Sequence, residues 1–157
     1  MRIELCEVQE IVGRMFVRMR AYDFLNMDDE SITEKLTQWM HSAVFKPYVR
    51  RLFDSIVLDD DFEDISYTMH YTIDADADRE FVIEVLSIGV CRAWLEEKIL
   101  DITNIKQLFS DKNSKWYSQA AHLNELQALY SSLDAEQKRL ISDRNSMSNR
   151  YIEEYRL

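Results

Sequence analysis

The sequence contains very little glycine and proline. Only two glycines and one proline occur in 157 residues, where average usage would give about 11 and about 8. A sandwich, a barrel or another turn-rich β-protein is difficult to build without these residues. Glycine-rich phosphate loops and the hydrolase nucleophile elbow are excluded as well, because Gly13 and Gly89 stand far apart. We therefore expect long helices.

Cysteine and histidine are also scarce. Cys6 and Cys91 lie far apart without a CxxC partner, so we expect buried thiols in a reducing compartment rather than disulfides or a zinc site. His41, His70 and His122 fall on three separate predicted elements, and none has a second histidine or a cysteine one helical turn away. These patterns predict no metal, no cofactor and no enzymatic activity.

Basic residues are fewer than acidic ones in this chain. Its 29 acidic and 19 basic residues give a net charge of −10, which disfavours proteins that grip nucleic acid by neutralising phosphates. The N-terminus lacks the apolar run of a signal peptide. The longest apolar stretch, 81–95, is interrupted by Glu84 and Arg92 and is too short to cross a bilayer. We expect a soluble protein that stays inside the cell and does not contact a membrane.

What the sequence does contain is helical periodicity, which favours a single, mainly α domain spanning residues 1–157. A first helix is predicted from a seam of apolar residues at spacings of three and four, namely Leu5, Val8, Val12, Met15, Met19 and Tyr22. Ser31 and Glu34 resemble a capping box that starts a second helix. Pro47 should bend that helix, or restart it before Tyr48, with the second segment running to Phe53.

The central element is expected to be a helix over about residues 79–100. It is apolar nearly all round between Phe81 and Leu95, so the other helices should wrap it as a bundle. Gly89 in its middle costs about 1 kcal/mol relative to alanine. That cost is reasonable if a neighbouring helix crosses closely at this point.

One segment changes to the period of a strand. Over residues 64–73 apolar side chains alternate with polar ones. A single strand cannot satisfy its own backbone. It needs either a hairpin partner, which the sequence does not make evident, or the edge of another subunit. Pairing between subunits is thus one of two open possibilities.

The C-terminal 44 residues, 114–157, contain no glycine or proline. They can form one long helix or two helices with a break near Ser131 and Ser132. Gln137 and Arg144 interrupt the apolar seam, and only one apolar residue lies between Ser142 and Arg150. We therefore expect residues 136–157 to protrude as a helical arm, exposed to solvent or bound to a neighbouring subunit.

The excess negative charge is concentrated in one segment. Residues 59–80 hold nine acidic residues and one basic residue, whereas residues 1–58 and 81–157 each carry a net charge of −1. The glycine of an EF-hand loop is absent, so a solvated acidic insert is the preferred interpretation. Such a segment can dock on a basic surface, bind cations, or repel DNA inside a channel.

Three stretches resemble a known family. Residues 107–112 (QLFSDK) and 116–123 (WYSQAAHL), together with Arg92-Ala93-Trp94-Leu95, are similar to small virion proteins of tailed bacteriophages, the head-to-tail connector, neck or adaptor proteins. The resemblance covers roughly residues 81–135 and carries no catalytic signature. It implies a mainly helical, non-enzymatic subunit of a ring, typically of twelve copies, that binds portal and tail or neck proteins while DNA passes through.

The sequence thus predicts a virion structural protein that is assembled in the host cytoplasm. An acidic regulatory or inhibitory protein that mimics DNA is the alternative. The residues expected at interfaces are Asp59, Asp60, Asp61, Glu63, Asp64, Tyr67, Tyr71, Asp74, Asp76, Asp78, Trp116, Tyr117, Gln119, His122, Arg144, Tyr151 and Tyr155.

Overall fold

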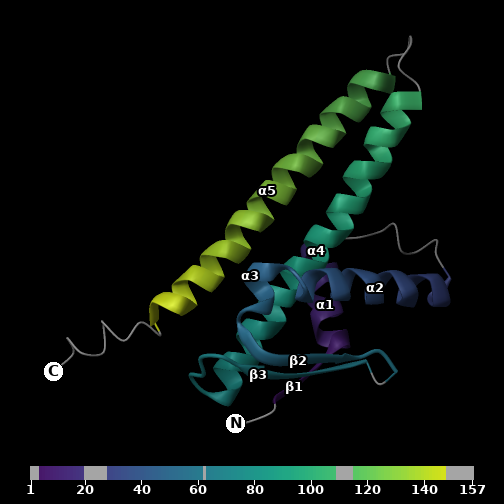
Figure 1. Ribbon diagram of the computed structural model, residues 1–157. Helices are drawn as coiled ribbons and strands as arrows, with labels where there is room; N and C mark the ends of the chain where they lie inside the picture. Colours follow the sequence, from purple (N-terminus) through teal and green to yellow (C-terminus); the bar gives the residue numbers. More distant parts are fainter. Residues whose placement is uncertain (1–3, 20–27, 62, 109–114, 148–157) are drawn as a thin grey trace.

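The protein is mainly α-helical with one small antiparallel sheet (Figure 1). A computed structural model describes residues 4–19, 28–61, 63–108 and 115–147. Its elements in chain order are β1 (Glu4–Glu7), α1 (Val8–Met19), α2 (Asp29–Val44), α3 (Pro47–Arg50), β2 (Phe53–Asp59), β3 (Asp64–Met69), α4 (Ala75–Leu108) and α5 (Lys115–Met147). The predicted fold class, with its central apolar helix and long C-terminal helix, is confirmed.

Helix α4 is the centre of the molecule. It packs against α5, α2, α1 and β1, and residues 85–95 are buried without interruption. Each large apolar side chain buried in this way contributes about 1.5–3 kcal/mol to folding. Because this stretch of α4 is apolar nearly all round, every side of it must be covered, and this requirement arranges the other elements around it.

Gly89 marks the closest helix crossing in this core. A Cβ atom at Gly89 would lie 2.8 Å from Ala43 Cβ of α2 and 3.3 Å from Gln137 Nε2 of α5. Real Cβ atoms do not approach side chains so closely, so glycine lets three helices meet at one level. The predicted close crossing is confirmed.

The sheet corrects the prediction of a lone strand. Its order is β1-β3-β2 with both pairs antiparallel, so β3 lies in the middle and both its edges are occupied. Another subunit therefore cannot pair with β3. The strand also ends at Met69 rather than at residue 73.

The two partner strands each have a local pattern that resembles a helix. Residues Glu4–Glu7 continue the apolar spacing of α1, which placed them in the first helix, but they form β1. Phe53 was expected to end a helix and instead begins β2. The signal for β2 was the run Ile56-Val57-Leu58, rich in β-branched residues.

The boundaries of α2 and α3 follow local chemistry. Asp28, not Ser31, caps α2: its Oδ1 accepts a hydrogen bond of 2.7 Å from the Ser31 amide, and this bond lowers the pKa of Asp28. The predicted capping box is therefore wrong by three residues. The predicted restart at Pro47 is confirmed, since α2 ends at Val44 and Pro47 is the first residue of α3.

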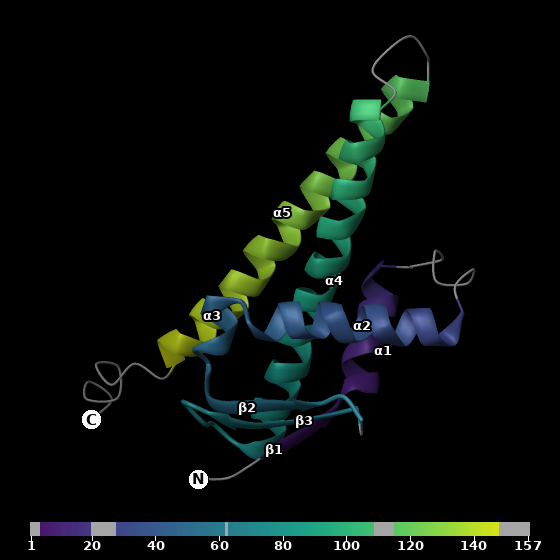
Figure 2. The same ribbon diagram turned by 45° about the vertical axis from the view of Figure 1, so that its right-hand side comes forward.

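Helices α4 and α5 form an antiparallel hairpin that projects well beyond the other elements (Figures 1 and 2). Helix α5 continues through Ser131 and Ser132 without a break. The projecting end is the one where α4 ends and α5 begins (Figure 1). The last turns of α5 return to α3 and to the loop after β3 (Figure 2). The predicted C-terminal arm is thus wrong for residues 136–147, where Gln137, Ile141 and Arg144 are buried. Residues 148–157 lie outside the described part.

Replacing Gly89 with alanine should destabilise the protein. The new Cβ would press on the Ala43 backbone and side chain, and overpacking of this kind costs about 1–3 kcal/mol of unfolding free energy. Gly13→Ala is the matched control, because a Cβ atom at Gly13 in α1 would have nothing within 4 Å of it. That change should stabilise by about 0.5–1 kcal/mol. Urea denaturation measures both, and equal stabilisation by the two variants would contradict a tight crossing.

Candidate protein interaction surfaces

The tip of the β2–β3 hairpin carries a run of exposed negative charge. Asp59, Asp60 and Asp61 are all exposed. The Asp61 amide donates to Asp59 Oδ1 at 3.2 Å, and His41 Nε2 lies 3.0 Å from an Asp60 carboxylate oxygen. These contacts order the turn, and its carboxylates remain exposed to solvent.

The turn is closed without glycine and is tied to the rest of the fold. Glu63 adopts a positive φ of 54°, which a non-glycine residue takes only at a cost. Its carbonyl oxygen accepts a hydrogen bond of 2.9 Å from the Val8 amide at the start of α1. The hairpin tip is thus fastened to the first helix.

A cavity of about 210 Å³ lies beside this tip, between α1, α2 and the β2–β3 hairpin. Its walls combine apolar side chains with a rim of four carboxylates. The apolar residues are Val8, Val12, Leu36, Met40 and Leu58, and the acidic ones are Asp59, Asp60, Glu63 and Asp64.

The remaining acids of segment 59–80 lie elsewhere. Strand β3 separates the hairpin tip from the start of α4, and the two lie at opposite ends of the sheet (Figure 1). Asp74 caps α4 by accepting a 2.8 Å hydrogen bond from the Ala77 amide, and Asp76 is exposed in the first helical turn. The acidic segment is therefore two surfaces rather than one.

Asp78 and Arg144 are structural and do not lie at an exposed interface, contrary to prediction. Their side chains are 1% and 8% exposed and form a salt bridge. Asp78 also accepts hydrogen bonds from the Ile73 amide at 3.1 and 3.3 Å, and Arg144 donates to the Tyr71 carbonyl at 3.0 Å. This pair fastens the end of α5 to the first turn of α4 and to the loop before it.

The aromatic residues and their neighbours that were predicted at interfaces differ in burial. Tyr67 is fully buried in the core, where its ring meets Phe53 edge to face with centroids 5.8 Å apart, so its prediction was wrong. Tyr71 is 52% exposed, and His122 is exposed on α5. The side chains of Trp116, Tyr117 and Gln119, and all of Tyr151 and Tyr155, lie outside the described residues.

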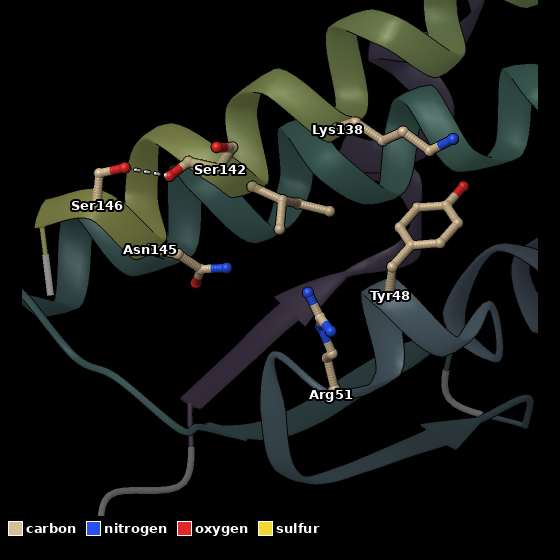
Figure 3. A pocket seen from close by; sticks show the side chains of 7 residues that line it. Tyr48, Arg51, Lys138, Ser142, Asn145 and Ser146 are labelled. Carbon is tan, nitrogen blue, oxygen red and sulfur yellow. Dashed lines mark hydrogen bonds between the residues drawn. The ribbon is translucent and has the colours of Figure 1, made fainter. Parts of the chain in front are cut away.

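A second cavity, of about 530 Å³, lies between α3 and the last turns of α5 (Figure 3). It is lined by Tyr48, Arg51, Lys138, Ile141, Ser142, Asn145 and Ser146. None of these lining residues is acidic, although the chain carries a charge of −10. We call this cavity the basic pocket. The sequence interpretation missed it, because the polar residues between 142 and 146 suggested an unpacked arm.

A buried polar network fixes one wall of the basic pocket. Arg92 donates to Gln137 Oε1 at 2.7 Å and to the Tyr130 hydroxyl at 3.0 Å, and it pairs with Asp134 at 2.8 Å. Gln137 also accepts a 3.1 Å hydrogen bond from the hydroxyl of Tyr48. A buried polar group with several partners rigidifies its surroundings, so Tyr48 is held in place.

The cysteines show no sign of reactivity. Both are buried and free, and burial raises the pKa of Cys6 and of Cys91 from 9.0 to about 12. The predicted buried thiols are confirmed. Within the described residues, no three histidine, cysteine, aspartate or glutamate side chains are grouped closely enough to hold a metal ion.

Comparison with known proteins gives no relative: no protein-family model, no curated sequence and no solved structure matches this chain. Among the described helices, none has the length and apolar character needed to span a membrane. The surfaces themselves must therefore support any proposal about function.

Removing the Asp78 carboxylate should cost about 3–5 kcal/mol of unfolding free energy, because Arg144 would remain buried without its ion-pair partner. Asp76→Ala, two residues away on the exposed side of the same turn, should change stability by less than about 0.5 kcal/mol. Thermal and urea unfolding of Asp78→Ala and Asp76→Ala tests this. Similar losses from both would refute a structural role for Asp78.

The cysteines should resist a thiol reagent in the native protein at mildly alkaline pH and react once the protein is unfolded. Their raised pKa keeps them protonated, and the thiolate is the reactive form. The stability that the neutral thiols contribute is complete below the ordinary pKa of 9.0 and is lost as pH rises towards about 12. Rapid modification of the native protein would contradict this description.

Proposed function

We propose that this chain is a non-enzymatic structural subunit that works by assembly, as a ring-forming connector or adaptor between the portal and the tail of a virus particle. The observation that carries the proposal is the projecting α4–α5 hairpin. At about 1.5 Å per residue, a helix of 34 residues such as α4 is about 50 Å long. The sheet, α1 and α2 accompany only its first part (Figure 2).

The projecting hairpin has apolar side chains that this chain leaves uncovered. Leu100 on α4 is 61% exposed and Leu129 on α5 is 41% exposed. A single exposed leucine is ordinary, but a two-helix projection with leucines on both helices suits contact with another helix. This supports an arm that packs on a neighbouring subunit.

The acidic surfaces fit the same proposal. The carboxylates of the hairpin tip and of Asp76 are exposed, and exposed negative charge repels phosphate. A connector needs DNA to pass without binding tightly, so acidic surfaces near its channel would serve it.

Mutation of the projecting leucines tests the proposal. Leu100→Glu and Leu129→Glu should abolish self-association, or co-purification with portal and neck proteins, because burying an unpaired carboxylate is costly. Val17→Glu is the matched control, since Val17 is 81% exposed on α1 in the body of the protein, and it should assemble normally. Native mass spectrometry, with and without co-expressed portal and neck proteins, gives the readout.

The alternative, a DNA mimic, predicts a different result from the same samples. It gives a monomer or dimer that binds the basic groove of a nucleic-acid enzyme and is displaced by duplex DNA. Failure to associate both with itself and with portal or neck proteins, combined with such displacement, would replace the connector proposal.

A further inference from the structure

The basic pocket offers several hydrogen-bond donors to a ligand. Arg51 is exposed and faces the cavity (Figure 3). Among the described residues, its side chain has no hydrogen-bond or ion-pair partner. Lys138, which also pairs with Asp134, lies across the cavity, and the Ser142 hydroxyl comes from the same helix. The Ser146 hydroxyl already donates to the Ser142 carbonyl at 2.9 Å. A guanidinium binds carboxylates through two parallel N–H donors, so the pocket suits an acidic ligand.

The chain itself carries a ligand of this kind. The β2–β3 tip presents Asp59, Asp60 and Asp61 in succession on a narrow turn at the end of the sheet (Figure 1). A convex acidic turn and a concave basic pocket complement each other in charge and in form. Within one copy they cannot meet, because Arg51 lies just before β2 and the tip lies just after it.

We propose that copies of this chain associate head to tail, with the acidic β2–β3 tip of one copy seated in the basic pocket of the next. The seven residues of β2 separate the two surfaces by about 23 Å at about 3.3 Å per residue. A contact between two different surfaces leaves one of each open at the ends of a pair. Further copies can then add until the series closes into a ring. The inference rests on the proposed function, because it supplies the contact by which the subunits would associate.

The buried network makes the pocket a preformed site. Tyr48 is held by Gln137, and the Lys138 ammonium lies 5.7 Å from the centre of the Tyr48 ring while pairing with Asp134 at 2.8 Å. A site whose side chains are already positioned loses less entropy when its ligand binds. The pocket therefore favours association without rearrangement of α3 or α5.

Charge reversal on each surface tests the contact. Arg51→Glu and Asp61→Lys should each weaken self-association about tenfold or more, since a like charge replaces an attraction. The controls make the same charge changes outside the contact: Arg139→Glu on α5, where the side chain is 84% exposed, and Asp76→Lys at the other end of the sheet. Sedimentation velocity at low and high salt measures association, and circular dichroism verifies folding.

Two combinations of these variants test whether the tip of another copy occupies the basic pocket. The double variant Arg51→Glu/Asp61→Lys exchanges the charges and should regain self-association. A mixture of the two single variants should also regain association and grow, because one kind of contact pairs the two unchanged surfaces and the other pairs the two charge-reversed surfaces. If neither combination regains association, or if Arg51→Glu and Asp61→Lys assemble as their controls do, the head-to-tail contact is wrong.

Different experimental results would refute the head-to-tail contact and the proposed function. If the charge variants assemble normally while Leu100→Glu does not, the contact is refuted and the structural subunit stands. The same conclusion follows if the wild-type chain remains a monomer alone but joins portal or neck proteins. If the wild-type chain neither associates with itself nor joins portal or neck proteins, both proposals are wrong.

Discussion

The structure depends on one constraint: the middle of helix α4 is apolar nearly all round and must be shielded from water on every side. Its uninterrupted buried stretch, 85–95, cannot form until α1, α2, α5 and the sheet surround it. Gly89 permits this crowding, because any side chain there would meet Ala43 of α2. The cost of a mid-helix glycine, about 1 kcal/mol, is small beside the apolar area that the close approach buries.

Buried polar residues fix how α5 packs on α4, which apolar contacts alone would not determine. Gln137 enters the core of the bundle at 1% exposure and is held through the Val85 carbonyl at 2.8 Å, Tyr48 and Arg92. Burying an amide without partners would cost free energy, so the register of α5 on α4 is fixed by where these partners stand. The Asp78–Arg144 pair fixes the last turn of α5 in the same way. As a consequence the last turns of α5 form a firm wall of the basic pocket.

Composition and period predicted most of the helical fold, because α4 and the restart at Pro47 are governed by local rules. What could not be predicted was pairing between distant segments. Strand β1 joins β3 across about sixty residues, and a helical period of apolar residues hides it. Gln137 and Arg144 indicated exposure because their buried partners are distant in sequence. For the same reason the acidic excess of 59–80 was taken as one surface, although Asp78 is neutralised inside the protein and β3 separates the remainder.

The two pairings of the central strand differ greatly in the chain entropy they require. Strands β2 and β3 are joined by a short turn, and such hairpins form within about 1–10 μs. Strand β1 must close a loop of about sixty residues before it can pair, and loop closure costs more as the loop lengthens. Strand β1 therefore joins the sheet late. Until it does, one edge of β3 is open, so the protein is most exposed to wrong strand pairing just before β1 docks.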